Sequence, residues 1–217
     1  MNTKIITWNE ERGFEADELA ESAQIIRNGG LVAFPTETVY GLGGNGLDPQ
    51  ASQKIYAAKG RPSDNPLILH IAKIDQLHEV VREIPEAAAT LAEAFWPGPL
   101  TMIFKKADCV PYETTGGLDT VAVRMPQHMG ALQFLEEAGV PVAAPSANTS
   151  GRPSPTLAKH VKEDLDGKID MIIDGGEVGI GFESTIVDVT EEIPVILRPG
   201  FITQKMLQEI VGEVQMD

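Results

Sequence analysis

Cysteine is almost absent from this sequence. Cys109 is the single one among 217 residues, so an intrachain disulfide is excluded, and so is a structural zinc site built on several thiolates. His78, His128 and His160 show no mutual spacing typical of metal ligands. A chain so poor in cysteine is typical of a reducing compartment, and we expect a cytoplasmic protein without a metal site.

Long hydrophobic runs are also missing. The first eight residues lead directly into the polar run 9–12 (NEER), without the apolar segment and small-residue cleavage site of a secretory signal. No apolar stretch elsewhere reaches the roughly 20 residues that a helix needs to cross a bilayer. We therefore expect no leader and no membrane contact.

Positive charge is scarce, because 17 basic residues stand against 32 acidic ones and the formal net charge is −15. Such a field repels polyanions and argues against a protein that coats nucleic acid. Several cations nevertheless lie beside Gly, Pro or Ser, where the chain should turn. They are Lys59, Arg61, Arg124, Arg152 and Arg198. That placement indicates a local pocket for an anionic ligand; scattered solvated cations are the alternative.

The hydrophobic pattern predicts one α/β domain over residues 1–217, and 42% hydrophobic residues can supply its core. Strands are expected at 31–34, 67–71, 100–104, 120–124, 141–144, 171–174, 184–189 and 195–198. Helices are expected at 16–28, 48–58, 75–82, 86–95, 127–138, 157–165 and 203–211. The turn between 184–189 and 195–198 is too short for a crossover helix, so the sheet should be mixed.

Residues 41–46 (GLGGNG) fit the glycine pattern of a dinucleotide-binding turn. That pattern also needs a helix at its last glycines and an acidic residue about 20 positions later. Here the helix signal comes later, at Asp48 and Pro49, and the corresponding region reads Asn65-Pro66-Leu67. We therefore interpret 41–46 as a glycine turn that lets the backbone pass close to another group.

A basic turn follows the second expected helix. Residues 59–67 (KGRPSDNPL) place Lys59, Arg61, Ser63 and an amide on a rigid segment, which suits phosphate oxygens. It is not a Walker loop, because no G-x-x-x-x-G-K-[ST] occurs. The alternative is a solvated helix end at which cations favour the dipole, and in either case we expect both cations to be exposed.

A polar loop follows the expected strand 141–144. Residues 145–154 (PSANTSGRPS) emerge at the carboxyl end of that strand, where ligands of open α/β sheets gather. Ser146 lacks the G-x-S-x-G elbow of a hydrolase nucleophile. A plain loop remains the alternative, because clusters of Ser, Asn, Gly and Pro often have no other role.

Taken together, these segments resemble the YrdC family in content, order and spacing. The motifs are 34–42 (FPTETVYGL), 59–67, 145–154, 184–185 (ST) and 198–200 (RPG), with 96–101 (WPGPLT) and 120–126 (TVAVRMP) also similar. The resemblance covers roughly residues 10 to 205. It implies a YrdC-like twisted mixed sheet flanked by helices, with a concave basic pocket. Some relatives carry a second C-terminal domain, so this chain is either a short form or part of a longer protein.

The resemblance also implies residue roles. Threonine would be contacted by Thr36, His70, Arg124 and Ser184. The nucleotide would be contacted by Lys59, Arg61, Ser63, Thr120, Ser146, Asn148, Ser154 and Arg198. Lys59 and Arg61 are the candidates for catalysis, because charge must be neutralised where phosphate reacts.

The activity implied by the resemblance is threonylcarbamoyl-adenylate synthesis from L-threonine, bicarbonate and ATP, with Mg²⁺ carried on the ATP phosphates. The product would pass to a tRNA threonylcarbamoyl transferase. The alternative is a related module that binds RNA or a nucleotide without synthesis. The basic pocket favours this alternative and allows weak RNA binding, whereas the net charge of −15 opposes it. A different acceptor, as in the much longer hydrogenase-maturation proteins, is a third reading.

Overall fold

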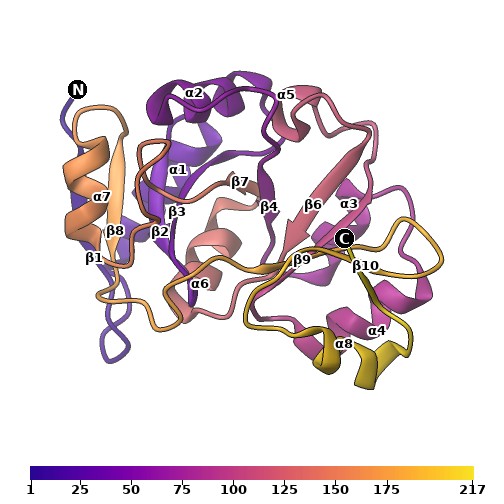
Figure 1. The fold of residues 1–217 in the computed structure, drawn as a ribbon. Coiled ribbons are helices and arrows are strands. Elements are labelled where there is room, and N and C mark those ends of the chain that lie inside the picture. The colour runs from indigo at the N-terminus through magenta and orange to yellow at the C-terminus, as the bar shows by residue number, and fades with distance from the viewer.

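The computed structural model describes residues 1–217 and contains one mixed sheet of eleven strands (Figure 1). In spatial order the strands are β1 (Lys4–Thr7), β8 (Met171–Asp174), β2 (Val32–Pro35), β3 (Tyr40–Asn45), β7 (Val142–Ala144), β4 (Ile68–His70), β6 (Thr120–Arg124), β5 (Leu100–Lys105), β9 (Thr185–Asp188), β10 (Val195–Arg198) and β11 (Gln215–Met216). The sheet contains both parallel pairs, such as β4 with β6, and antiparallel pairs, such as β5 with β6. This arrangement confirms the expected mixed α/β sheet, including the antiparallel pairing of β9 with β10.

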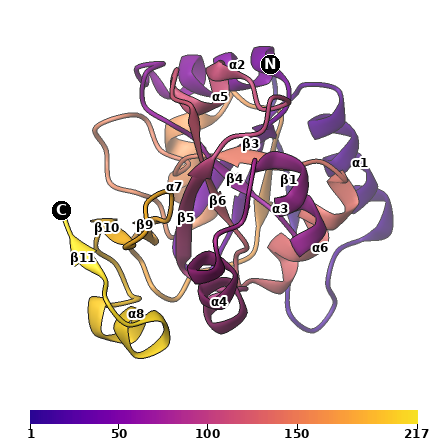
Figure 2. The same cartoon turned by 90° about the vertical axis from the view of Figure 1, so that its right-hand side faces the viewer.

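Helices cover the sheet in groups. They are α1 (Ala16–Arg27), α2 (Pro49–Lys59), α3 (Ile74–Val80), α4 (Glu86–Phe95), α5 (Tyr112–Thr115), α6 (Met129–Ala138), α7 (Ala158–Leu165) and α8 (Gln204–Val211). Contacts join α1 to α6, α2 to α5, and α4 to α8. Figure 2 shows α2 and α5 at one end of the molecule and α4 and α8 at the other. The longer predicted helices are therefore confirmed, with shifts of a few residues at their ends.

The core lies on both sides of the sheet. One cluster of 36 buried residues includes Leu69, Phe104 and Val123, and a second of 13 residues includes Phe34 and Phe134. The central strands read as continuous apolar runs because both of their faces are covered. Both clusters hold the strand ends that surround the candidate site in fixed positions.

The prediction of a glycine turn at 41–46 was wrong, because most of this segment forms the central strand β3. A Cβ on Gly43 would lie 2.7 Å from a methyl of Val142, and one on Gly44 would lie 3.2 Å from Ile55. Glycine within a strand often marks a place where another segment of the backbone or its side chains approach closely. The glycines therefore allow neighbouring side chains to pack closely against β3. The expected close approach is confirmed, although it occurs along a strand and not in a turn.

The start and end of α2 follow the sequence signals. The Asp48 carboxylate accepts a hydrogen bond from the Gln50 backbone N–H at 2.9 Å, and Pro49 occupies the first turn. Gly60 ends the helix in the left-handed region, with φ 63°. Lys59 is thus the last helical residue, and the chain turns sharply between it and Arg61.

Candidate functional site

A cavity of about 320 Å³ opens on one face of the sheet. Its floor comes from alternate residues of neighbouring strands, which point to the same side of a sheet. Ile68 and His70 of β4 lie beside Ala122 and Arg124 of β6, and Ile103 of β5 continues the row. The walls are Thr36, Thr38, Val39, Gly41, Arg61, Asn65, Pro66, Ala144, Pro145, Ser146, Glu183, Ser184, Ile186 and Arg198. The floor is thus apolar except for His70 and Arg124, and the walls add polar groups from distant parts of the sequence.

The turn after β2 is held by its own hydroxyl groups. Thr36 Oγ1 donates to the Val39 carbonyl at 2.7 Å and lies 2.9 Å from Thr38 Oγ1. Thr36 has then used its single proton, so Thr38 must donate to Thr36. Both side chains are buried, and Pro35 marks the end of the strand as expected. The turn is a fixed wall of the cavity.

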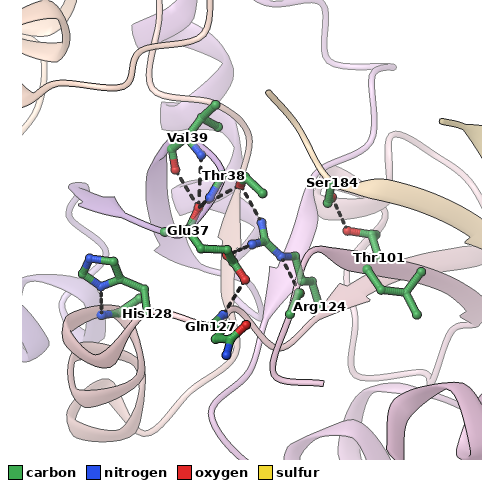
Figure 3. Close-up of polar contacts among 12 residues, drawn as sticks. Glu37, Thr38, Val39, Thr101, Arg124, Gln127, His128 and Ser184 are labelled. Atoms are coloured by element: carbon green, nitrogen blue, oxygen red, sulfur yellow. Dashed lines mark hydrogen bonds and ion pairs between the residues drawn. The ribbon is translucent and has the colours of Figure 1, made fainter. Parts of the chain in front are cut away.

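Arg124 crosses from β6 toward this turn. Its Nε donates to the Gly98 carbonyl at 3.2 Å, Nη1 donates to Thr38 Oγ1 at 3.1 Å, and Nη2 donates to the Glu37 carboxylate. Figure 3 shows the guanidinium beside Glu37 and Thr38. Burial lowers the pKa of Arg124, and the neighbouring Glu37 charge opposes that shift. The cavity therefore has a guanidinium that is fixed on one side by protein acceptors.

His70 lies next to Arg124 on the floor. Burial, with the Arg124 charge as a second cause, lowers the pKa of His70 to about 3. Its Nδ1 is 3.0 Å from the Ile68 carbonyl, and the ring meets Phe34 edge-on at 5.6 Å. The imidazole is therefore neutral near pH 7 and adds a polar contact without adding charge.

Ser184 and Arg198 form the opposite wall. Arg198 donates from Nε to the Ser184 carbonyl at 3.0 Å, from Nη2 to Ser184 Oγ at 3.3 Å, and from Nη1 to Glu183 at 2.9 Å. The Ser184 hydroxyl also pairs with Thr101 Oγ1 at 2.7 Å (Figure 3). Sequence reasoning missed Thr101, which has no exposed area and whose only signal was its place in the segment 96–101.

Arg61 has an unsatisfied donor. Its Nη2 donates to the Pro66 carbonyl at 3.0 Å, whereas the buried Nε has no acceptor. Burial lowers the pKa of Arg61, with a smaller contribution in the same direction from Arg198. A buried N–H without a partner is costly, and an anion in the cavity would satisfy it.

Lys59 is buried and Arg61 is half-buried, so the expectation that both cations are exposed was wrong. The Lys59 side chain is 2% exposed, because it runs beneath the loop that follows β7. Its Nζ donates to the Ser146 carbonyl, to the Asn148 carbonyl at 2.7 Å and to Asn148 Oδ1 at 3.2 Å. Ser146 Oγ in turn donates to Asn148 Oδ1 at 2.5 Å. Lys59 and Asn148 are thus buried and hold the loop in place, whereas Ser146 lines the cavity.

Stability should depend on pH through Lys59. Burial, aided by the Arg61 charge, lowers the pKa of Lys59 from 10.5 to about 8. Between those values the unfolded chain keeps a proton that the folded chain has lost, so the free energy of unfolding should rise with pH. Relative to Lys59→Met, the wild type should gain up to about 3 kcal/mol between pH 7 and pH 10 in denaturant titrations. A difference that stays constant over this range would contradict the shift.

Besides Lys59 and Asn148, three more of the expected contacts lie outside the cavity. Ser63 is exposed, Ser154 is half-buried in the loop before α7, and Thr120 lies at the far end of β6 from Arg124. Thr120 shares the sheet face of Ala122 and Arg124, about 13 Å along the strand from Arg124. It lines a second, polar cavity of about 460 Å³ with Lys105 and Arg82. Their roles stay predictions, whereas the structure brings seven of the expected residues together in one cavity: Thr36, Arg61, His70, Arg124, Ser146, Ser184 and Arg198.

No three His, Cys, Asp or Glu side chains gather in a way that could hold a metal ion. None of the helices is both long and apolar enough to span a bilayer.

Comparison with known proteins gives consistent matches. The family model Sua5_yciO_yrdC, described as "Telomere recombination", matches residues 24–200. The threonylcarbamoyl-AMP synthase of Pyrococcus abyssi is 58% identical over 195 residues, which are 90% of this chain and 57% of that protein. The enzyme of the same name from Bacillus subtilis is 50% identical, over 100% of this chain and 64% of its own length.

A solved structure supports the same relationship. The crystal structure of P. abyssi Sua5 complexed with L-threonine superposes with a TM-score of 0.96 at 55% identity, covering 99% of this chain and 63% of that one. This chain therefore spans about three fifths of the length of these relatives.

Proposed function

Because this chain belongs to the Sua5/YciO/YrdC family, we propose that it synthesises threonylcarbamoyl-AMP from L-threonine, bicarbonate and ATP. The observation that carries the proposal is the single cavity that gathers Thr36, His70, Arg124 and Ser184 with Arg61 and Arg198. The first four suit a small zwitterion with a hydroxyl group, and the other two suit phosphate. The names of the relatives and the threonine complex of P. abyssi Sua5 support the same function.

The reaction needs two successive bond-forming steps. The threonine amine, after losing a proton, attacks bicarbonate to give a carbamate and water. A carbamate oxygen then attacks the α-phosphorus of ATP, and the bond to the β-phosphate oxygen breaks to release pyrophosphate. Neither step needs a covalent enzyme intermediate, so the residues act by holding two anionic reactants in line and neutralising charge.

The cavity divides these tasks between its two sides. We assign the threonine carboxylate to Arg124, and the amino acid's hydroxyl to the wall formed by Thr36 and Ser184. We assign the ATP phosphates to Arg61 and Arg198, with the unpaired Nε of Arg61 as one donor. Lys59 lies directly below Ser146, so its charge would act on phosphate through the loop that it supports. Ser63, Ser154 and Thr120, which lie outside the cavity, would contact parts of the nucleotide that extend beyond it, and Asn148 would act through Ser146, whose hydroxyl donates to its side chain.

The setting of the reaction is also part of the proposal. Magnesium would arrive on the ATP phosphates, as is usual where a chain supplies few carboxylate ligands. The product would pass to a transferase that modifies tRNA. We place the reaction in the cytoplasm, since a chain with one cysteine suits a reducing compartment.

Pyrophosphate release should require both L-threonine and bicarbonate. The reason is that the attacking oxygen exists only after the two have combined. Coupled-enzyme detection of pyrophosphate, with each component omitted in turn, measures this dependence. L-Serine lacks one methyl group, so its kcat/KM should be lower by a factor that corresponds to about 1 to 3 kcal/mol of activation free energy. Release at an unchanged rate without threonine would identify an ATP pyrophosphatase, and RNA binding without any release would favour a binding module.

A further inference from the structure

Arg124 has more donors than the protein uses. A guanidinium carries five N–H groups, and three of them have acceptors here: the Gly98 carbonyl, Thr38 Oγ1 and Glu37 Oε1. One N–H on Nη1 and one on Nη2 therefore remain. Arg124 is only 3% exposed and lines the cavity, so a group bound in the cavity could accept from these two donors.

The Glu37 carboxylate pairs with this guanidinium, and both of its oxygens accept hydrogen bonds from the protein. Oε1 accepts from Arg124 Nη2, and Oε2 accepts from the Gln127 backbone N–H at 2.7 Å (Figure 3). Its side chain is 15% exposed, and it is absent from the cavity lining. Because both carboxylate oxygens already accept from the protein and Glu37 does not line the cavity, Glu37 is poorly placed to accept a proton from a bound ligand. Its geometry fits support of Arg124.

The segment that carries Glu37 is itself pinned. The Ile180 backbone N–H donates to the Glu37 carbonyl at 3.1 Å, and the Gly181 N–H donates to the Thr38 carbonyl at 3.0 Å. These bonds fix the turn against the glycine-rich segment that leads to Ser184. Hydrogen bonds therefore fix both the backbone and the carboxylate of Glu37. A carboxylate fixed in this way can orient the guanidinium that it contacts.

We propose that Glu37 is a positioning residue: it fixes the Arg124 guanidinium so that the two remaining N–H groups grip the α-carboxylate of the amino-acid substrate. This inference rests on the proposed function for the identity of the ligand. Without Glu37 the guanidinium would lose its counter-charge and one of its three anchors. A bidentate pair depends on orientation, so the loss should appear in carboxylate recognition before anything else.

Calorimetry with two ligands tests the role. L-Threonine and L-threoninamide differ in the carboxylate, and below about pH 7 both keep a protonated amine. Wild type should bind L-threonine more tightly by at least about tenfold. In Glu37→Ala this ratio should fall to within about threefold, while ATP affinity changes less than about twofold. Glu136→Ala, which removes an exposed glutamate paired with Lys73, is the matched control and should keep the ratio.

The outcomes separate this role from the proposed function. Wild type that binds no L-threonine would refute the function itself. If the ratio of L-threonine to L-threoninamide affinity is unchanged in Glu37→Ala, including when both affinities fall equally, the positioning role is refuted. The proposed function would not be affected by that result. If Glu37→Ala does not fold, Glu37→Gln decides: its amide keeps one acceptor instead of two, so the ratio must still fall by at least about threefold.

Discussion

Lys59→Met should reduce synthesis of threonylcarbamoyl-AMP by about 10²- to 10³-fold, a loss typical of removing one preorganised electrostatic group. Methionine keeps most of the length of the stem but offers no donor to the two carbonyls and the Asn148 amide oxygen. The loop then loses its support, and Ser146 loses its fixed place in the cavity wall. Steady-state pyrophosphate release at saturating L-threonine gives kcat, where we expect most of the loss.

The same substitution should also lower stability, which distinguishes a buried support from an exposed cation. Three acceptors lose their donor, while the removal of a buried charge offsets part of that loss. We expect the free energy of unfolding to fall by about 1 to 3 kcal/mol at pH 7. Lys54→Met is the matched control, because Lys54 lies on the same helix, is exposed and donates only to the Gly29 carbonyl at 2.9 Å. Wild-type turnover in Lys59→Met would show that the loop keeps its shape without the ammonium group.

The contrast between Lys59 and Arg61 shows how far the sequence could lead. The helix signals around Asp48 and Gly60 place both cations at the end of α2. They cannot show that a loop more than 80 residues later returns over Lys59, because burial there comes from tertiary contacts. Ser146 and Asn148 illustrate the same limit: they are two residues apart in one motif, yet one lines the cavity and the other lies below it.

Elements with weak local patterns were also missed. β1 has one buried residue, Ile6, and β11 has none, so neither shows a hydrophobic alternation that predicts a strand. β3 was missed for the opposite reason, since its glycines suggest a turn but serve close packing in the centre of the sheet. Strands with continuous apolar runs, such as β6 and β8, were predicted well because burial on both faces leaves a clear signal.

Glu37 lies within the motif that indicated the family, but its role depends on a partner 87 positions away. Nothing in the turn after β2 indicates a buried ion pair, because a lone glutamate between threonines is equally compatible with solvent. The pair appears only when β6 lies beside β4 and its last residue points toward the turn. Stability measurements can therefore show how strongly the fold depends on a contact that the sequence does not reveal.

Arg124→Met should cost about 3 to 5 kcal/mol of stability, because it leaves the Glu37 carboxylate without its counter-charge in a site that is largely closed to water. The double variant Glu37→Leu, Arg124→Met removes both charges, and similar apolar volume should restore at least half of the loss. Chemical denaturation of the wild type, both single variants and the double variant gives the coupling free energy. The exposed pair Lys73 and Glu136 is the reference cycle, with an expected coupling below about 1 kcal/mol.

Recovered stability should not bring back function. If Arg124 holds the threonine carboxylate as proposed, the double variant lacks the guanidinium for it. Threonine-dependent pyrophosphate release should then stay at least about 10²-fold below wild type even when the fold is as stable as the wild type. A double variant that recovers both stability and threonine use would mean that Arg124 serves the fold alone. Recovery of stability without activity would instead assign the buried pair to substrate recognition, because the protein tolerates its replacement by apolar groups and the reaction does not.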